Sequence, residues 1–64
     1  MDNIIRQNIN ILYNRNKEKV EQETRKFLNI KKRENSDDFL NLNEDMKIKI
    51  LKQMIENNEI SLFH

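Results

Sequence analysis

The chain of 64 residues contains no glycine and no proline, and this restricts both its folds and its chemistry. Without glycine there is no loop whose backbone can closely approach a phosphate, as nucleotide-binding motifs require. The chain also lacks cysteine, which excludes a disulfide framework, a thiolate metal site and a cysteine nucleophile. Element boundaries must therefore be inferred from hydrophobic periodicity and from helix-capping residues.

The first half of the chain has the apolar spacing of a helix. Apolar side chains recur on one wide arc at Ile4, Ile5, Ile9, Ile11 and Leu12, and again at Val20, Phe27 and Leu28. Between the two sets, opposite charges lie four residues apart, as in Lys17 and Glu21. We predict one long helix over about residues 3–33, which would be about 45 Å long. A break at residues 14–16 is the alternative.

A second helix is predicted over about residues 44–57. Asn43 is a suitable N-cap, and the apolar positions between Met46 and Ile55 share one arc. Asn57 or Asn58 can end this helix in the left-handed conformation that glycine usually supplies. Residues 34–38 would connect the two helices, with Ser36 as a further cap. The sequence therefore predicts an all-α helical hairpin that forms a single small domain over residues 1–64.

The start of the long helix is expected to lack a partner within the chain. A second helix of about 21 Å can cover residues near 20–33 but cannot reach the isoleucine-rich start. Ile5, Ile9 and Leu12 would then face water, which is unusual for an apolar stripe on a stable monomer. We expect either a homodimer seam or a docking helix for another protein there, and a bent helix that folds back is a third arrangement.

Basic residues gather in the first half of the chain. Residues 1–33 hold nine basic and four acidic residues, a net charge of +5, whereas residues 34–64 hold three basic and seven acidic residues, a net charge of −4. Contacts with nucleic-acid phosphates would use Lys26, Lys31, Lys32 and Arg33. Because acidic residues interrupt the run of basic residues, the other interpretation is that these basic side chains form a solvated helix face. A small nucleic-acid-binding regulator is therefore the alternative function.

The sequence contains no convincing catalytic or metal-binding set. Asn41, Asn43 and Asp45 have the spacing of three calcium-loop ligands, but Met46 stands where that loop requires glycine. The single histidine, His64, has no serine and orienting acid placed for a catalytic triad. We expect no enzymatic activity, catalytic residue, metal, cofactor or small-molecule substrate.

The last residues carry the most specific motif. The segment Glu59-Ile60-Ser61-Leu62-Phe63 resembles the pentapeptide Gln-Leu-(Ser/Asp)-Leu-Phe, by which many bacterial replication and repair proteins bind the DNA sliding clamp. Ser61, Leu62 and Phe63 match it, Ile60 replaces leucine, and Glu59 stands where glutamine is preferred. The resemblance implies that residues 59–64 form a linear-motif tail whose Leu-Phe pair fills an apolar pocket of the clamp. Alternatively, Ile60, Leu62 and Phe63 fold back onto the helical core or pair as a strand in a dimer.

These features favour a small non-catalytic adaptor or inhibitor that binds a larger host protein, with the sliding clamp as the most specific candidate. The longest apolar run is three residues, Ile11–Tyr13, so we expect no transmembrane helix. The first twenty residues lack the apolar core of a secretory signal, and we therefore expect a cytoplasmic protein. Frequent Asn, Ile and Lys indicate AT-rich codons, which are typical of a low-GC bacterium, a phage or a mobile element.

Overall fold

Three short helices replace the single helix predicted over residues 3–33. The computed structural model describes residues 1–31 and 37–63, and in it α1 spans Asp2–Gln7, α2 spans Ile9–Arg15 and α3 spans Lys17–Leu28. The prediction of one continuous helix is therefore wrong. The alternative break at residues 14–16 is confirmed at Asn16, and a second break lies at Asn8.

Asparagine side chains account for both breaks. The Asn8 Nδ2 donates to the Ile4 carbonyl oxygen over 2.7 Å, and the Asn16 Nδ2 donates to the Leu12 carbonyl oxygen over 3.0 Å. At Asn8 the side chain takes the place of the backbone N–H, which bonds instead to the Ile5 carbonyl oxygen over 3.0 Å. At Asn16 the side chain shares the Leu12 carbonyl oxygen with the Asn16 backbone N–H. The ψ angles of 14° and 32° at these residues lie outside the helical region, so the helix ends and restarts in a new direction.

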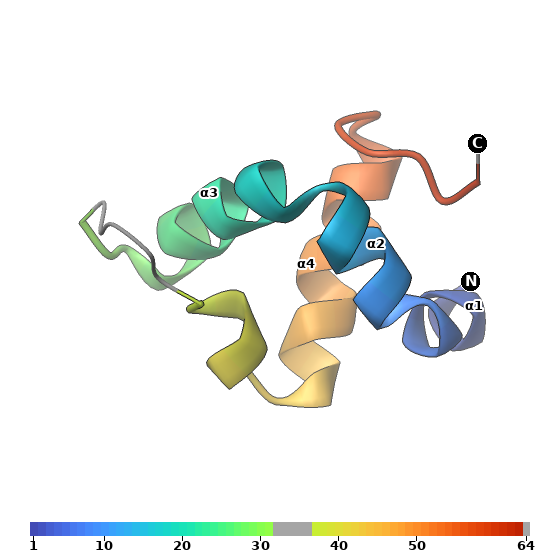
Figure 1. Ribbon diagram of the computed structural model, residues 1–64, viewed down its shortest axis with the longest axis horizontal. Helices are drawn as coiled ribbons and strands as arrows, with labels where there is room; N and C mark the ends of the chain where they lie inside the picture. Colours follow the sequence, from blue (N-terminus) through green and yellow to red (C-terminus); the bar gives the residue numbers. More distant parts are fainter. Residues whose placement is uncertain (32–36, 64) are drawn as a thin grey trace.

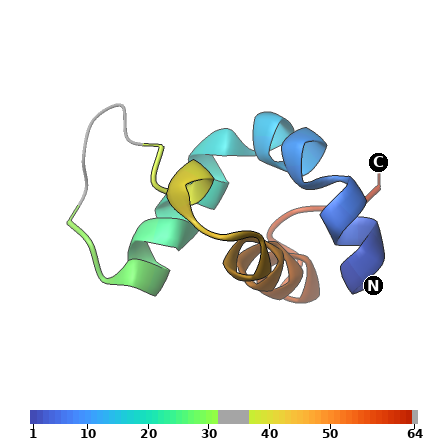
Figure 2. The same cartoon turned by 90° about the horizontal axis from the view of Figure 1, so that it is seen from below.

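The two bends allow α1, α2 and α3 to curve around α4, which spans Glu44–Glu56. Figure 2 looks nearly along α4 and shows the first three helices as an arc on one side of it. A short 3-10 turn, η1 (Phe39–Asn41), precedes α4 and packs against α3 (Figure 1). The longest dimension is 30 Å and the radius of gyration is 10.9 Å, close to the value of about 10.7 Å for a compact chain of this length.

The boundaries of α4 agree with the prediction. Asn43 Oδ1 accepts a hydrogen bond of 2.9 Å from the Met46 backbone N–H, as an N-cap does. Asn58 has a φ of 60°, and the next backbone N–H donates to the Met54 carbonyl over 2.9 Å, which completes a Schellman cap. Asn29 adopts the same left-handed conformation and ends α3 at Leu28, well before residue 33. Asparagine therefore serves at both helix ends where glycine is usual.

One apolar core joins the four helices, η1 and the residues after α4. Its buried members are Ile5, Leu12, Tyr13, Val20, Phe39, Ile48, Ile50, Leu51, Met54 and Ile60. Ile5 and Leu12 are 0% exposed and Ile9 packs against the cluster, so the expectation that these three residues lack an intrachain partner is wrong. Because the bends bring α1 and α2 onto α4, the stripe predicted as a dimer seam is buried within one chain.

The all-α class is confirmed over the residues that the structure describes, since every regular element there is a helix. None of these helices combines the length and the apolar character needed to cross a membrane. The predicted cap at Ser36 and the histidine at position 64 lie outside the described residues. Both ends of the described chain lie at the same end of the molecule's long axis (Figures 1 and 2).

Candidate functional site

The tail, residues 59–63, leaves α4 and turns back against the junction of α2 and α3. The reversal occurs at Asn58, whose left-handed conformation redirects the chain immediately after the last helical turn (Figure 1). Ile60 then enters the core, where its side chain is 6% exposed. The motif that resembles a clamp-binding peptide is therefore attached to the folded domain rather than extending freely from it.

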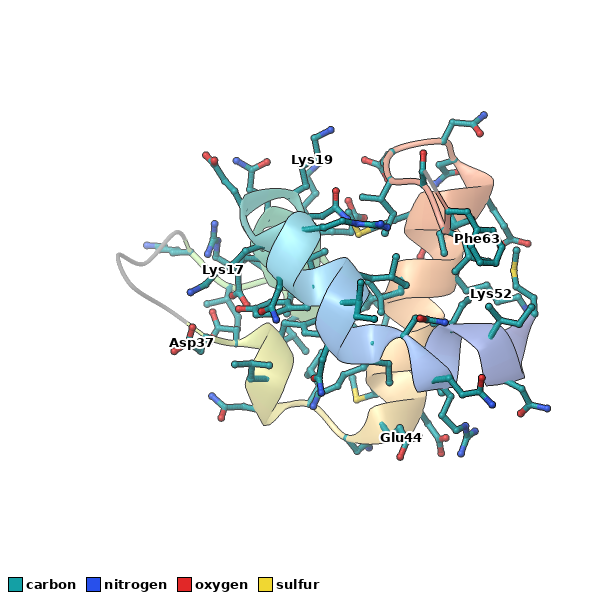
Figure 3. The ribbon with its side chains drawn as sticks, turned by 45° about the vertical axis from the view of Figure 1, so that its right-hand side comes forward. Lys17, Lys19, Asp37, Glu44, Lys52 and Phe63 are labelled. Carbon is teal, nitrogen blue, oxygen red and sulfur yellow. The ribbon has the colours of Figure 1, made fainter. Side chains whose placement is uncertain are left out.

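Successive tail side chains point to different surroundings. Ile60 lies in the core, Leu62 is half-buried against it, and Ser61 is exposed. Phe63 is 69% exposed, the highest fraction among the large apolar side chains given for the described chain. Figure 3 shows its ring at the edge of the molecule. The chain bends at residues 59, 60 and 62, and these bends leave Ile60 and Leu62 against the core while Ser61 and Phe63 are exposed.

Two cationic side chains hold the tail through its backbone. The Arg15 Nη2, at the end of α2, donates to the Ser61 carbonyl oxygen over 3.3 Å. The Lys19 Nζ, in the first turns of α3, donates to the Glu59 carbonyl oxygen over 3.5 Å. Both bonds are longer than the roughly 2.7–2.9 Å of strong charge-assisted hydrogen bonds, and both are exposed to solvent. They orient the tail, whereas Ile60 supplies the main attachment.

A cleft of about 340 Å³ lies between the tail and the helices beneath it. It is lined by Arg15, Asn16 and Lys19 on one side and by residues 58–61 on the other. The bend at Asn16 creates this geometry, because it places the end of α2 and the start of α3 around the tail. The same asparagine that interrupts the long helix therefore helps to form the surface on which the tail rests.

A buried carboxylate connects α2, α3 and η1. Glu21 is 4% exposed and accepts hydrogen bonds from the Tyr13 hydroxyl (2.8 Å) and from the backbone N–H groups of Asp38 (3.1 Å) and Phe39 (3.2 Å). The Tyr13 and Phe39 rings stack with centroids 5.0 Å apart. Burial raises the pKa of the Tyr13 hydroxyl, and the hydrogen bond to Glu21 and the negative charges of Glu21 and Asp37 raise it further.

This network fixes η1 against α3, and it was not predicted from the sequence. Helical spacing pairs Glu21 with Lys17, but the Lys17 Nζ instead lies 3.8 Å from an Asp37 carboxylate oxygen. Glu21 faces the core on the same side of α3 as Val20 and Thr24, both fully buried. The signal available in the sequence is Tyr13, a core-facing residue whose hydroxyl needs a partner. The carboxylate acts structurally, as the acceptor that fixes η1.

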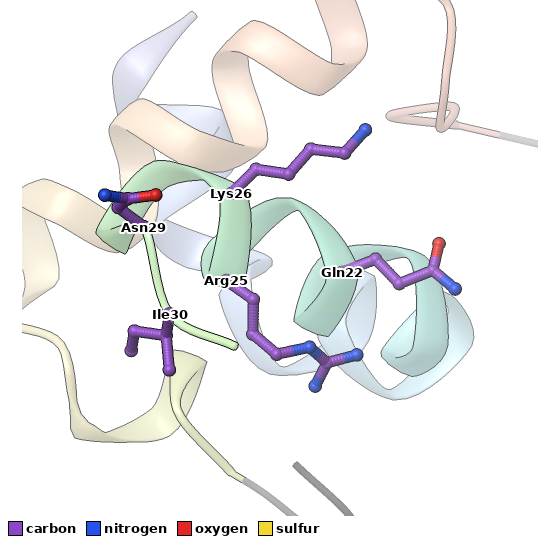
Figure 4. Close-up of a pocket in the computed structure, with 5 residues that line it drawn as sticks. All are labelled: Gln22, Arg25, Lys26, Asn29 and Ile30. Carbon is purple, nitrogen blue, oxygen red and sulfur yellow. The ribbon is translucent and has the colours of Figure 1, made fainter. Parts of the chain in front are cut away.

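The structure describes two of the four basic residues proposed for nucleic acid, Lys26 and Lys31. Lys26 is exposed on α3 and lines a cleft of about 400 Å³ with Gln22, Arg25, Asn29 and Ile30. Figure 4 shows the Arg25 and Lys26 side chains leaving the helix in different directions. Lys31 is exposed beyond the end of α3, and Lys32 and Arg33 lie outside the described residues.

The exposed end of the tail is therefore the strongest candidate site. It presents Phe63 and part of Leu62, and Ile60, three residues before Phe63, is anchored in the core. Across residues 1–31 and 37–63, no group of three or more His, Cys, Asp or Glu side chains is placed to hold a metal ion. Comparison with protein-family models, with curated proteins and with solved structures found no match to this chain.

Proposed function

We propose that this protein is a non-catalytic binding protein that docks on a larger protein through its C-terminal tail, and that the bacterial DNA sliding clamp is its target. The observation that supports this most is Phe63, a phenyl ring that is 69% exposed at the end of the tail. Transfer of such a ring into an apolar pocket yields about 1.5–3 kcal/mol. Large aromatic side chains of this kind are the residues that dominate protein–protein binding energies.

The tail also has the form of a docking peptide. No regular secondary structure occurs in residues 59–63, and Leu62 and Phe63 provide the adjacent apolar pair of the clamp-binding pentapeptide. The folded domain limits the freedom of the tail by holding its backbone at Glu59 and Ser61. The exposed ring of Phe63 lies at the outer end of this segment, where a partner can reach it.

The biological role that follows is that of a small adaptor or inhibitor acting in the cytoplasm. A tail that occupies the clamp pocket excludes other clamp-binding proteins or recruits whatever else the small domain contacts. A phage or mobile element that redirects host replication is the type of source that such a protein suits. Competition and recruitment differ in one respect, since only recruitment requires a second binding surface on the helices.

The test is a binding measurement between the full chain and purified bacterial sliding clamp. Phe63→Ala should weaken the affinity at least tenfold, which corresponds to about 1.4 kcal/mol. The matched control is Phe27→Ala, which removes another exposed ring, on α3, away from the tail. It should leave the affinity unchanged. Absence of clamp binding by the wild-type chain at 100 µM, or equal loss in both variants, would refute the proposal.

Salt separates this proposal from the nucleic-acid alternative. Docking of an apolar pair changes little between 50 and 200 mM salt, whereas binding to phosphates through Lys26, Lys31, Lys32 and Arg33 should weaken steeply. Charge reversal at Lys26 and Lys31 is the corresponding substitution. If charge reversal abolished binding to a DNA duplex and Phe63→Ala left that binding unchanged, the results would favour the nucleic-acid-binding regulator over the clamp-binding protein.

A further inference from the structure

Ile60 has two roles that cannot be filled at the same time. In the folded chain its side chain is 6% exposed within the core, and Leu62 packs against the same cluster. The docking set expected from the sequence, Ile60, Leu62 and Phe63, would place the same two side chains against the partner. A side chain buried in its own domain is not available to a second protein. Full engagement of residues 59–63 therefore requires that the tail leave the core.

The contacts that hold the tail use the groups a docking peptide needs. Arg15 and Lys19 donate to the carbonyl oxygens of Ser61 and Glu59. Main-chain groups of an extended peptide commonly bond to the surface that receives it. While these two carbonyls accept hydrogen bonds from α2 and α3, they are directed toward the protein's own helices. The two cations therefore compete with any partner for the same segment.

A hinge lies immediately before the tail. Asn58 has a φ of 60° at the end of α4, so rotation there moves the tail. This rotation breaks the bond from the Glu59 N–H to the Met54 carbonyl oxygen, whereas the hydrogen bonds within Glu44–Glu56 are retained. Beyond Asn58 the tail is held by the bond from the Glu59 N–H to the Met54 carbonyl oxygen, by the Arg15 and Lys19 hydrogen bonds and by the packing of Ile60 and Leu62. The tail can therefore separate as a unit, with a cost set by a few named contacts.

We propose that the tail is an autoinhibitory latch, in which Ile60 in the core and the Arg15 and Lys19 hydrogen bonds hold the docking motif in a closed position. The inference rests on the proposed function. The partner selects the open form, so the apparent affinity falls in proportion to the fraction of molecules that are open. Burial of one isoleucine side chain corresponds to roughly a ten- to hundredfold reduction of that fraction.

The experiment compares a latch variant with a charge-matched control. Arg15→Ala/Lys19→Ala removes both tail contacts. Arg6→Ala/Lys31→Ala removes the same residue types at exposed positions outside the set that holds the tail. Two quantities are measured on the full chain, the ¹³C-methyl resonances of Ile60 and the dissociation constant for purified sliding clamp. Ile5, which is fully buried, and Ile11, which is 55% exposed, provide internal references for the two extremes.

In the latch variant, the Ile60 resonances should move toward those of Ile11 and clamp binding should tighten three- to tenfold, while the control matches the wild type. Three results would overturn the latch alone. They are wild-type Ile60 resonances already at the Ile11 extreme, clamp binding by the wild type that the latch variant does not tighten, and equal tightening in the control. Absence of clamp binding by the wild type at 100 µM would instead refute the proposed function, and the latch with it.

Discussion

Removal of the Glu21 carboxylate should abolish most of the stability of this domain. Glu21→Ala leaves the Tyr13 hydroxyl and the backbone N–H groups of Asp38 and Phe39 without their acceptor. Hydrogen bonds to a charged group contribute about 1.5–3 kcal/mol each. The three are not additive, and part of the loss is offset because the variant no longer buries a charge.

The expected net loss is about 3–5 kcal/mol, because three buried donors lose their acceptor at about 1–3 kcal/mol each and the removal of a buried carboxylate offsets part of this. A domain of 64 residues has a total unfolding free energy of roughly 3–10 kcal/mol. The alanine variant should therefore be largely unfolded at 37 °C or close to it. Glu21→Gln keeps the side-chain length and one oxygen acceptor but turns an amide donor toward other donors. Its loss should be smaller, about 2 kcal/mol.

Urea unfolding followed by circular dichroism gives the free energies. Tyr13 is the single tyrosine and there is no tryptophan, so tyrosine fluorescence reports on this network in the same samples. Glu18→Ala is the control, because Glu18 is exposed on the same helix, and a surface change of this kind alters stability by less than about 0.5 kcal/mol. If Glu21→Ala lost no more than Glu18→Ala, the carboxylate would not be the acceptor that connects α3 to η1.

Three smaller perturbations test the other local interactions. The raised pKa of Tyr13 means that this residue leaves the unfolding free energy unchanged with pH below about pH 10 and lowers it above that pH, by up to about 1.4 kcal/mol per pH unit. Tyr13→Phe should remove this part of the decrease, as measured by urea titrations at several pH values. Asn43→Ala should cost about 1 kcal/mol by loss of the α4 N-cap, whereas Asn41→Ala should change the urea midpoint little. Asn58→Gly should preserve the thermal midpoint or raise it slightly, and Asn58→Ala should cost about 1 kcal/mol because alanine disfavours a φ of 60°. Equal midpoints for the glycine and alanine variants would contradict the left-handed cap.

Local signals were sufficient to predict α4. Its N-cap at Asn43, its apolar arc and its left-handed end at Asn58 depend on residues within a few positions of one another. The breaks at Asn8 and Asn16 are different, because an asparagine side chain can point to solvent or bond to the preceding turn. Packing of α1 and α2 onto α4 favours the bent form here, and that packing involves residues more than thirty positions away.

The candidate site was predictable in position but not in arrangement. The motif identified the tail, yet treating Ile60, Leu62 and Phe63 as one docking set overlooked that Ile60 is buried in the core while Phe63 is exposed. The hydrogen bonds of Glu21 could not be predicted from the sequence. Tyr13 and Glu21 are eight residues apart and meet only because the chain bends at Asn16 between them.

The two bends also decide whether this chain satisfies its own apolar surface or requires another copy of itself. Leucine at both Asn8 and Asn16 would favour a continuous helix from Asp2 to Leu28, about 40 Å long, in a molecule whose longest dimension is now 30 Å. Such a rod could not wrap around its own α4, and Ile5 and Leu12 would be uncovered. Exchange of helices between two chains would cover them again. The two asparagine side chains thus decide whether Ile5 and Leu12 are covered within one chain or by the helices of a second chain.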